Sequence, residues 1–142
     1  MKILTEKQKR EDIFYMDIAK IVATRSHSSR KKVGAILVKD NNILALGWNG
    51  TLPGANNLCE DEDNFEHSLV IHAVQNVVAR ASKSGFSTDG ATLYTTYSPC
   101  LFCALLTAQA GIKRVVYEEM NVPSAILTLQ QYGLDVQNVI RV

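Results

Sequence analysis

The chain has 142 residues, 46% of them hydrophobic, and a formal net charge of +1 at pH 7. These values predict one compact domain over residues 1–142 with a proper apolar core. The dispersed Lys and Arg residues argue against a nucleic-acid partner but leave room for a small anionic ligand, and no apolar run approaches the roughly 18 residues that a membrane span needs.

The first half of the chain predicts a helix, a β-hairpin and a long loop. Residues 9–25 carry apolar side chains at largely helical spacing. Residues 33–38 and 43–48 are short β-prone runs, and the Asp and Asn residues between them tolerate the backbone angles of a tight turn. Residues 50–66 are rich in Gly, Pro, Asn and acidic residues without periodicity, so we expect an ordered, functional loop over one end of the sheet.

The second half predicts alternating helices and strands. A helix is expected at 68–82, a strand at 91–96, and then a helix that Pro99 opens as its first residue and Gly111 closes. A strand at 114–117, a helix at 123–131 and a strand at 136–140 follow. The buried stripe of the 68–82 helix is predicted to consist of Leu69, Ile71, Val74, Val77 and Val78. The order predicts a three-layer α/β/α fold with a central mixed sheet of about five strands.

Three residues predict a metal site. A helix opened by Pro99 places Cys100 and Cys103 on one face of its first turn, where the positive end of the helix dipole favours thiolates. His72 lies near the start of the preceding predicted helix, so two helix N-termini can converge on one cation. One imidazole and two thiolates suit Zn²⁺ and leave a position open for a water, as a catalytic zinc requires. A redox cysteine pair, or a buried histidine beside core cysteines, is the alternative.

The cysteines also indicate the compartment. Three cysteines, two of them in a C-x-x-C, suit a reducing environment better than a disulfide framework. No secretory segment begins the chain, so we expect a cytoplasmic protein, in the host cytoplasm if the gene is viral. Cys59 and His67 could form a second metal site, although a packed free cysteine is the more ordinary expectation.

Several segments together resemble one enzyme family. His72-Ala73-Val74 with Pro99-Cys100-Leu101-Phe102-Cys103 is similar to the H-x-E and P-C-x-x-C signature of zinc deaminases that act on nucleobases. Residues 47–54 resemble the glycine-rich asparagine loop of deoxycytidylate deaminases, and residues 25–35, 56–60 and 109–117 are also similar to that family. The resemblance covers roughly residues 10–120 and implies a cytidine-deaminase-like version of the α/β/α fold.

The resemblance implies a reaction and a mode of regulation. The reaction would be hydrolytic deamination of dCMP to dUMP, in which zinc activates a water for attack on C4 of cytosine and a glutamate carries protons to N3 and to the leaving amine. The product would feed dTTP synthesis. The family also implies a homo-oligomer, expected to be a hexamer, that dCTP activates and dTTP inhibits with the help of Mg²⁺.

Val74 stands at the position of the family's proton-carrying glutamate. Valine cannot carry a proton and the adjacent Gln75 has no titratable one, so we expect an inactive or strongly impaired chain that still binds zinc. A natural inactive homologue and an active enzyme disabled by substitution both fit, and the completeness of the other motifs favours the second. The alternatives are a catalytically silent nucleotide-binding or regulatory subunit, and a related deaminase of another substrate, such as dCTP, cytidine, tRNA adenosine or a pterin-like base.

Candidate nucleotide contacts come from a basic segment and from the glycine-rich loop. Arg25 and Arg30 could hold a 5′-phosphate through bidentate hydrogen bonds, or they could belong to a solvated helix end. Asn49 could contact the deoxyribose hydroxyl, or it could be a turn asparagine that bonds to backbone. The predicted substrate contacts are Arg25, Ser26, Arg30, Asn49, Ala73 and Ser98. The predicted regulatory nucleotide site consists of Gly47, Asn49, Gly50, Gly54, Asn57 and Glu60.

Overall fold

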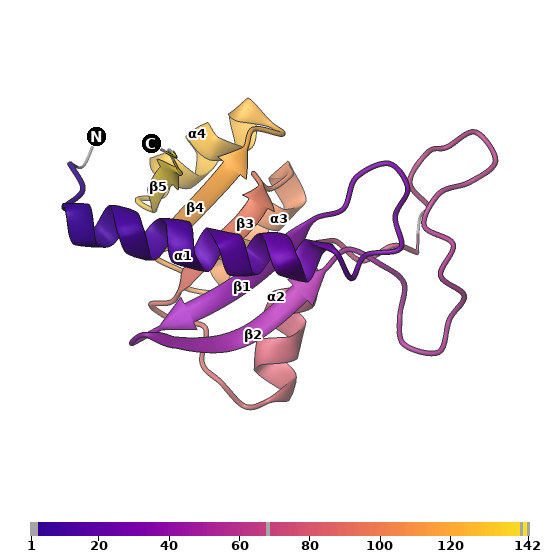
Figure 1. Ribbon diagram of the computed structural model, residues 1–142, viewed down its shortest axis with the longest axis horizontal. Coiled ribbons are helices and arrows are strands. Elements are labelled where there is room, and N and C mark those ends of the chain that lie inside the picture. The colour runs from indigo at the N-terminus through magenta and orange to yellow at the C-terminus, as the bar shows by residue number, and fades with distance from the viewer. Residues whose placement is uncertain (1–2, 68, 140, 142) are drawn as a thin grey trace.

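After an N-terminal helix and a hairpin, the chain alternates between helix and strand. The computed structural model describes residues 3–67, 69–139 and 141. Figure 1 shows the elements, which in chain order are α1 (Glu6–Ala23), β1 (Gly34–Lys39), β2 (Asn42–Trp48), α2 (Ala73–Lys83), β3 (Thr92–Tyr97), α3 (Leu101–Gln109), β4 (Arg114–Glu119), α4 (Pro123–Gln131) and β5 (Asp135–Asn138).

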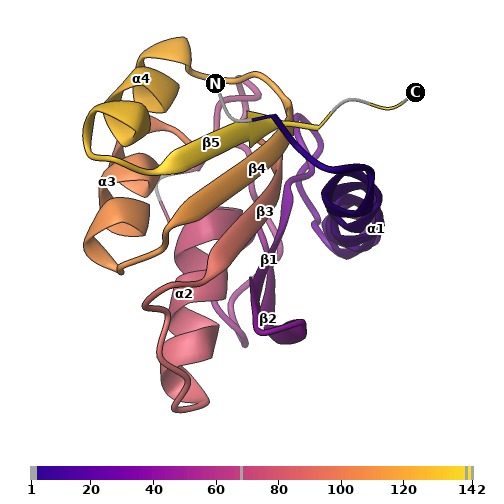
Figure 2. The ribbon, with the colours of Figure 1, turned by 90° about the vertical axis from the view of Figure 1, so that its left-hand side faces the viewer.

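The five strands form one mixed sheet in the order β2-β1-β3-β4-β5. Strand β1 runs antiparallel to β2 and β3, whereas β3, β4 and β5 are mutually parallel. Helix α1 covers one face of the sheet, and α2, α3 and α4 cover the other (Figure 2). An apolar cluster fills the space on each side of the sheet. This arrangement confirms the predicted three-layer α/β/α fold.

The predicted start of α2 is wrong, and the cause is a short pairing of extended backbone. Gly50 and Ile71 exchange two backbone hydrogen bonds of 3.0 and 2.7 Å, so the chain is extended up to His72 and becomes helical at Ala73. Leu69, predicted in the buried stripe, is 72% exposed. Residue 68, where the helix was predicted to begin, lies outside the described residues.

Other predicted boundaries differ by a few residues. Helix α1 begins at Glu6 rather than at residue 9 because the Thr5 hydroxyl caps it, accepting a 3.1 Å hydrogen bond from the Gln8 N–H. The expected turn of the hairpin is confirmed, with positive φ angles of 51° and 62° at Asp40 and Asn41. The last strand ends at Asn138, and Ile140, its predicted end, lies outside the described residues.

Two glycines let helices approach the β1–β2 hairpin closely. A Cβ on Gly34 would lie 2.1 Å from the Ala19 carbonyl oxygen of α1, and one on Gly47 would lie 2.6 Å from the Val77 nitrogen of α2. We predicted that Gly47 belongs to the regulatory nucleotide site, but its close neighbour in the structure is the α2 backbone. This contact places α2, and therefore its N-terminus, against the sheet. None of the described helices is long and apolar enough to cross a membrane.

A buried ion pair that the sequence pattern did not indicate joins α1 to the sheet. Both carboxylate oxygens of Asp12 accept hydrogen bonds from the Arg114 guanidinium, at 2.8 and 2.7 Å. The Tyr94 hydroxyl donates a further bond of 2.8 Å, and burial together with the nearby Asp12 carboxylate raises the pKa of Tyr94. Asp12 is 1% exposed, so its charge depends on these partners.

Replacing Asp12 by Ala leaves the Arg114 guanidinium buried with only Asp135, at 3.3 Å, as an acidic partner. We expect Asp12→Ala to lower the free energy of unfolding by about 3–5 kcal/mol, toward the lower end because Asp135 remains. Urea unfolding measures this loss. The control is Glu6→Ala, which removes an exposed ion pair with Lys9 and should cost less than about 1 kcal/mol. Equal losses in the two variants would contradict the assigned role of Asp12.

Candidate metal centre

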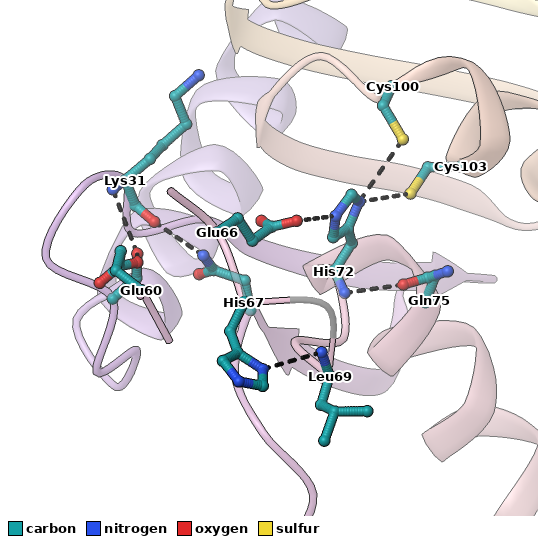
Figure 3. A network of polar contacts seen from close by, with 11 residues as sticks. Lys31, Glu60, Glu66, His67, Leu69, His72, Gln75, Cys100 and Cys103 are labelled. Atoms are coloured by element: carbon teal, nitrogen blue, oxygen red, sulfur yellow. Dashed lines mark hydrogen bonds and ion pairs between the residues drawn. The ribbon is translucent and has the colours of Figure 1, made fainter. Parts of the chain in front are cut away.

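Three ligand atoms meet where the N-termini of α2 and α3 converge. His72 is the N-cap residue of α2, Cys100 is the N-cap residue of α3, and Cys103 lies in the first turn of α3. The His72 Nδ1 atom lies 3.6 Å from the Cys100 sulfur and 3.4 Å from the Cys103 sulfur (Figure 3). The structure therefore brings the three predicted ligands together, all within 4.8 Å of one another.

Pro99 does not begin the helix as we predicted. Cys100 has extended backbone angles (φ −70°, ψ 172°), and its carbonyl accepts the first helical hydrogen bond from the Ala104 N–H at 2.9 Å. Pro99 consequently precedes the N-cap residue. In α2 the start of the helix is fixed by Gln75, whose side-chain oxygen accepts a 2.9 Å hydrogen bond from the His72 backbone N–H.

The spacing and the chemistry of the donors fit zinc. With zinc–sulfur and zinc–nitrogen bonds of about 2.3 and 2.0–2.1 Å, a tetrahedral ion separates its nitrogen and sulfur ligands by about 3.6 Å. The two N–S distances of 3.6 and 3.4 Å match this value. Burial, and then the charge of Cys100, raises the pKa of the Cys103 thiol. A bound cation would remove this obstacle by lowering the pKa of the thiol.

The ligands line a cavity of about 220 Å³. Ala73, Val74 and Ser98, all predicted site residues, line it too, and so do the basic Arg30 and Lys31. The Val74 side chain is 3% exposed and also belongs to the apolar cluster between the sheet and α2. The remaining lining residues are Ser28, Val33, Asn49, Glu60, Glu66, Thr95, Tyr97, Pro99 and Asn121. The cavity thus combines a metal triad, a cationic side and an apolar wall at Val74.

Comparison with known proteins identifies the family. Residues 9–119 match the family model of the cytidine and deoxycytidylate deaminase zinc-binding region. The chain belongs to this deaminase family. The crystal structure of dCMP deaminase from the cyanophage S-TIM5, in complex with dCMP and dUMP, superposes with a TM-score of 0.88 and 40% sequence identity, covering 96% of this chain and 99% of that one.

The chain covers different shares of two curated relatives. The chain is 37% identical over 132 residues to ComE operon protein 2 of Bacillus subtilis, covering 89% of this chain and 69% of that protein. It is 32% identical over 136 residues to deoxycytidylate deaminase of Saccharomyces cerevisiae, covering 84% of this chain but only 43% of that relative. The chain therefore spans less than half the length of the yeast deaminase.

Ser26 and Asn49, predicted substrate contacts of the deaminase, bond to protein backbone in this structure. The Asn49 side chain accepts a 2.9 Å hydrogen bond from the Val33 N–H and donates one of 2.8 Å to the Lys31 carbonyl. The Ser26 hydroxyl donates to the Asn49 carbonyl at 2.8 Å. Asn49 thus fixes the segment that presents Lys31, although it also lines the cavity.

Arg25 and most of the predicted regulatory residues line a second cavity of about 720 Å³. The Arg25 and Arg80 guanidinium carbons lie 5.0 and 5.1 Å from the centre of the Trp48 ring. Glu60, also predicted in the regulatory site, lines the first cavity instead. The predicted regulatory residues in the second cavity are Asn49, Gly50, Gly54 and Asn57.

Sequence reasoning missed two residues that line the first cavity, Tyr97 and Glu66. The Lys31 ammonium lies 4.5 Å from the centre of the Tyr97 ring, and its nitrogen is 3.4 Å from the Asn121 side-chain oxygen. Glu66 lies against the ring of His72 (Figure 3). Tyr97 could have been found from the sequence, because it directly precedes the Ser98-Pro99-Cys100 motif. The sequence carried no such signal for Glu66, because a loop sets its position.

The suggested second metal site at Cys59 and His67 does not assemble among the described residues. The one group of three metal-binding side chains that lie close together there is His72, Cys100 and Cys103. Cys59 is buried, as expected of a packed free cysteine, and burial raises the pKa of its thiol. The His67 Nδ1 atom accepts a 3.3 Å hydrogen bond from the Leu69 N–H.

The metal centre predicts about one zinc per chain, measurable by elemental analysis of protein produced in zinc-replete medium. Cys103→Ala should lose the metal and lower thermal stability, because its thiolate would be one of the three ligands of the proposed site. Cys59→Ala is the matched control, since it removes a buried cysteine outside the triad and should keep the zinc. Retention of stoichiometric zinc by Cys103→Ala would contradict the assigned ligands.

Proposed function

We propose that this chain has the scaffold of a hydrolytic deaminase that converts dCMP and water to dUMP and ammonia, in the supply of pyrimidine deoxynucleotides for dTTP synthesis. The observation that carries the proposal is the His72, Cys100 and Cys103 triad in the wall of a cavity that also contains cationic side chains. The similarity over nearly the whole chain to a dCMP deaminase solved with dCMP and dUMP supports this substrate.

The chain's own residues divide the work of the reaction. His72, Cys100 and Cys103 would hold zinc, which when bound activates a water for attack on C4 of the pyrimidine. Arg30 and Lys31 would attract the 5′-phosphate, and Lys31 is kept near the cavity by Tyr97 and Asn121. The small side chains of Ala73 and Ser98 would leave space for the base beside the metal ligands.

The proton carrier is the missing component, so we propose that this chain is inactive or strongly impaired. Val74 offers only methyl groups to the cavity, and the two acidic residues of the lining already have hydrogen-bond partners. Glu60 accepts three hydrogen bonds of 2.7 Å from Ser28 and Ser29, which lower its pKa. Glu66 bonds to the His72 ring. Loss of general acid–base catalysis costs about 10²–10⁴-fold in rate.

A catalytically silent nucleotide-binding or regulatory subunit is the second candidate, because Val74 takes away the proton carrier and leaves the rest of the cavity in place. A deaminase of another cytosine nucleotide, such as dCTP, would use the same triad. Binding and turnover of dCMP, dCTP and deoxycytidine, compared in one protein, separate these candidates. A protein that binds a nucleotide but gains no activity when the glutamate is supplied is a silent subunit.

We also propose that the second cavity binds the regulating nucleotide, dCTP as activator or dTTP as inhibitor with Mg²⁺, in a homo-oligomer expected to be a hexamer. Two guanidinium groups over an indole ring suit a ligand that combines a base with phosphates. Gly50 and Gly54, which line the cavity, let a nucleotide approach the backbone. Arg25 is therefore assigned to the regulator and Arg30 to the substrate.

Arg30→Ala should weaken the binding of dCMP much more than that of deoxycytidine, because only dCMP carries the phosphate. The expected difference is about 1.5–3 kcal/mol for a charge-assisted contact. Calorimetric titration of the unchanged and the variant protein measures it. Arg25→Ala is the matched control: it should leave the preference for dCMP intact and weaken the binding of dCTP or dTTP. Equal losses of dCMP and deoxycytidine in Arg30→Ala would rule out the phosphate role.

Val74→Glu should restore dCMP deamination, because it supplies the missing proton carrier beside an otherwise complete site. We expect a rate at least about 10²–10⁴-fold above that of the unchanged chain. Binding of dCMP should change little. A steady-state assay of ammonia or dUMP release provides the measurement.

Val74→Gln is the matched control, since it has nearly the size of the glutamate variant but cannot carry a proton, and it should stay inactive. Thermal melting checks the fold, because a carboxylate that pointed into the apolar cluster would destabilise the protein by several kcal/mol, on the order expected for an unpaired buried charge. A folded, zinc-loaded Val74→Glu protein without activity on dCMP, dCTP or deoxycytidine would favour the silent subunit.

A further inference from the structure

One carboxylate contacts a metal ligand of the candidate centre. The Oε1 atom of Glu66 lies 2.9 Å from the Nε2 atom of His72 (Figure 3). The other ring nitrogen, Nδ1, is the one that faces the two cysteine sulfurs. A carboxylate beside Nε2 favours the tautomer that carries its proton on Nε2, because that nitrogen can then donate to Glu66. In this tautomer Nδ1 has a free electron pair on the side of the thiols.

We propose that Glu66 is a positioning residue that holds the His72 ring in the orientation and tautomer required for metal binding. The inference rests on the proposed metal centre. Glu66 also lines the cavity, but its Oε1 atom lies at the edge of the ring away from Nδ1, so we place its role at His72. Such partners of metal-bound histidines fix the ring and make the ligating nitrogen more basic.

The need for such a partner follows from the place of His72 in the chain. His72 is the N-cap residue, so its side chain projects from the end of α2, and it is 36% exposed. The Gln75 side chain bonds to the backbone of His72 and does not contact Nε2 of the ring. Among the described residues, Glu66 supplies the one hydrogen bond to Nε2. Without it, the ring would lose orientational freedom only when the metal bound, at a cost in affinity.

Glu66 is itself held by a small hairpin formed by residues 59–67. The His67 N–H donates to the Cys59 carbonyl at 2.7 Å, and the Asp61 N–H donates to the Phe65 carbonyl at 2.8 Å. The Asp61 carboxylate closes the turn by accepting a 3.0 Å hydrogen bond from the Phe65 N–H. Cys59, at the base of the hairpin, is 3% exposed and contributes its backbone carbonyl to this pairing. Glu66 is therefore presented by an ordered backbone, although its side chain is half exposed.

The opposite side of this hairpin contacts the segment that precedes the cationic residues of the cavity. Glu60 pairs with Glu66 across the hairpin, and its carboxylate bonds to Ser28 and Ser29. Those serines directly precede Arg30 and Lys31, which line the cavity. The same hairpin therefore contacts a metal ligand through Glu66 and the segment carrying the cationic residues through Glu60. We expect this hairpin to set the distance between the two halves of the site.

The test is the zinc affinity of the full chain, measured by competition with a chromophoric chelator. Glu66→Ala should bind zinc about 10–100-fold more weakly than the unchanged chain. Glu66→Gln should recover part of the loss, because its side-chain oxygen can still accept from Nε2. Glu62→Ala is the matched control: Glu62 is an exposed acidic residue of the same hairpin, so its removal changes the local charge without touching His72.

A spectroscopic readout separates positioning from a general effect on folding. In the cobalt-substituted proteins, thiolate-to-cobalt absorption reports that Cys100 and Cys103 still bind, and the ligand-field bands report the histidine. Glu66→Ala should alter the ligand-field bands and keep the thiolate absorption, whereas Glu62→Ala should change neither. Metal-free melting temperatures check that each variant folds.

Two outcomes would overturn the inference. Unchanged zinc affinity in Glu66→Ala would show that His72 needs no partner, and an equal loss in Glu62→Ala would reduce the effect to general charge. His72→Ala distinguishes these results from failure of the metal centre itself, because it must lose the zinc if the centre is correct. Glu66→Ala can also be introduced into the Val74→Glu protein. If this double variant keeps its zinc affinity but loses the deaminase activity, Glu66 belongs to proton transfer instead.

Discussion

The convergence of two helix N-termini on one point is the constraint on which the rest of this structure depends. Helix α2 reaches the point because Gly47 lets it lie directly on β2, and α3 reaches it because it follows the carboxyl end of β3 through Ser98 and Pro99. Free backbone N–H groups make both helix ends partly positive. The thiols of Cys100 and Cys103 bring the compensating negative charge only when they ionise. A metal cation bound between the two thiolates would balance their negative charge.

Much of the fold and the triad could be predicted because they depend on local patterns. Helix α4 begins and ends at the predicted residues, 123 and 131, because Pro123 and the apolar spacing both mark it. The candidate metal ligands were recognisable because few residue types bind zinc. The start of α2 could not be recognised from the sequence, since apolar residues at 69 and 71 suit an extended segment as well as a helix. Pairing of Ile71 with Gly50 settles the matter, and a distant partner leaves no trace in the local sequence.

The contacts that sequence reasoning could not supply are those made by loops and by pairs distant in the chain. Arg25 and Arg30 are close in sequence and chemically identical, yet they line different cavities. The difference arises because α1 has ended at Ala23 and Asn49 then holds the backbone at Lys31 and Val33. The Asp12–Arg114 pair and the Glu66–His72 contact have the same character. Only the folded chain shows which of several equivalent charges lies in which site.

Trp48 is a fluorescent residue that lines the second cavity and not the first. It is the only tryptophan of the chain, and the guanidinium carbons of Arg25 and Arg80 lie 5.0 and 5.1 Å from the centre of its ring in the second cavity. The first cavity is lined by Tyr97 but by no tryptophan among the described residues. A ligand that enters the second cavity must displace or screen a charge next to the indole, which changes its emission. Intrinsic fluorescence therefore distinguishes occupancy of the second cavity from occupancy of the metal-bearing one, without any added label.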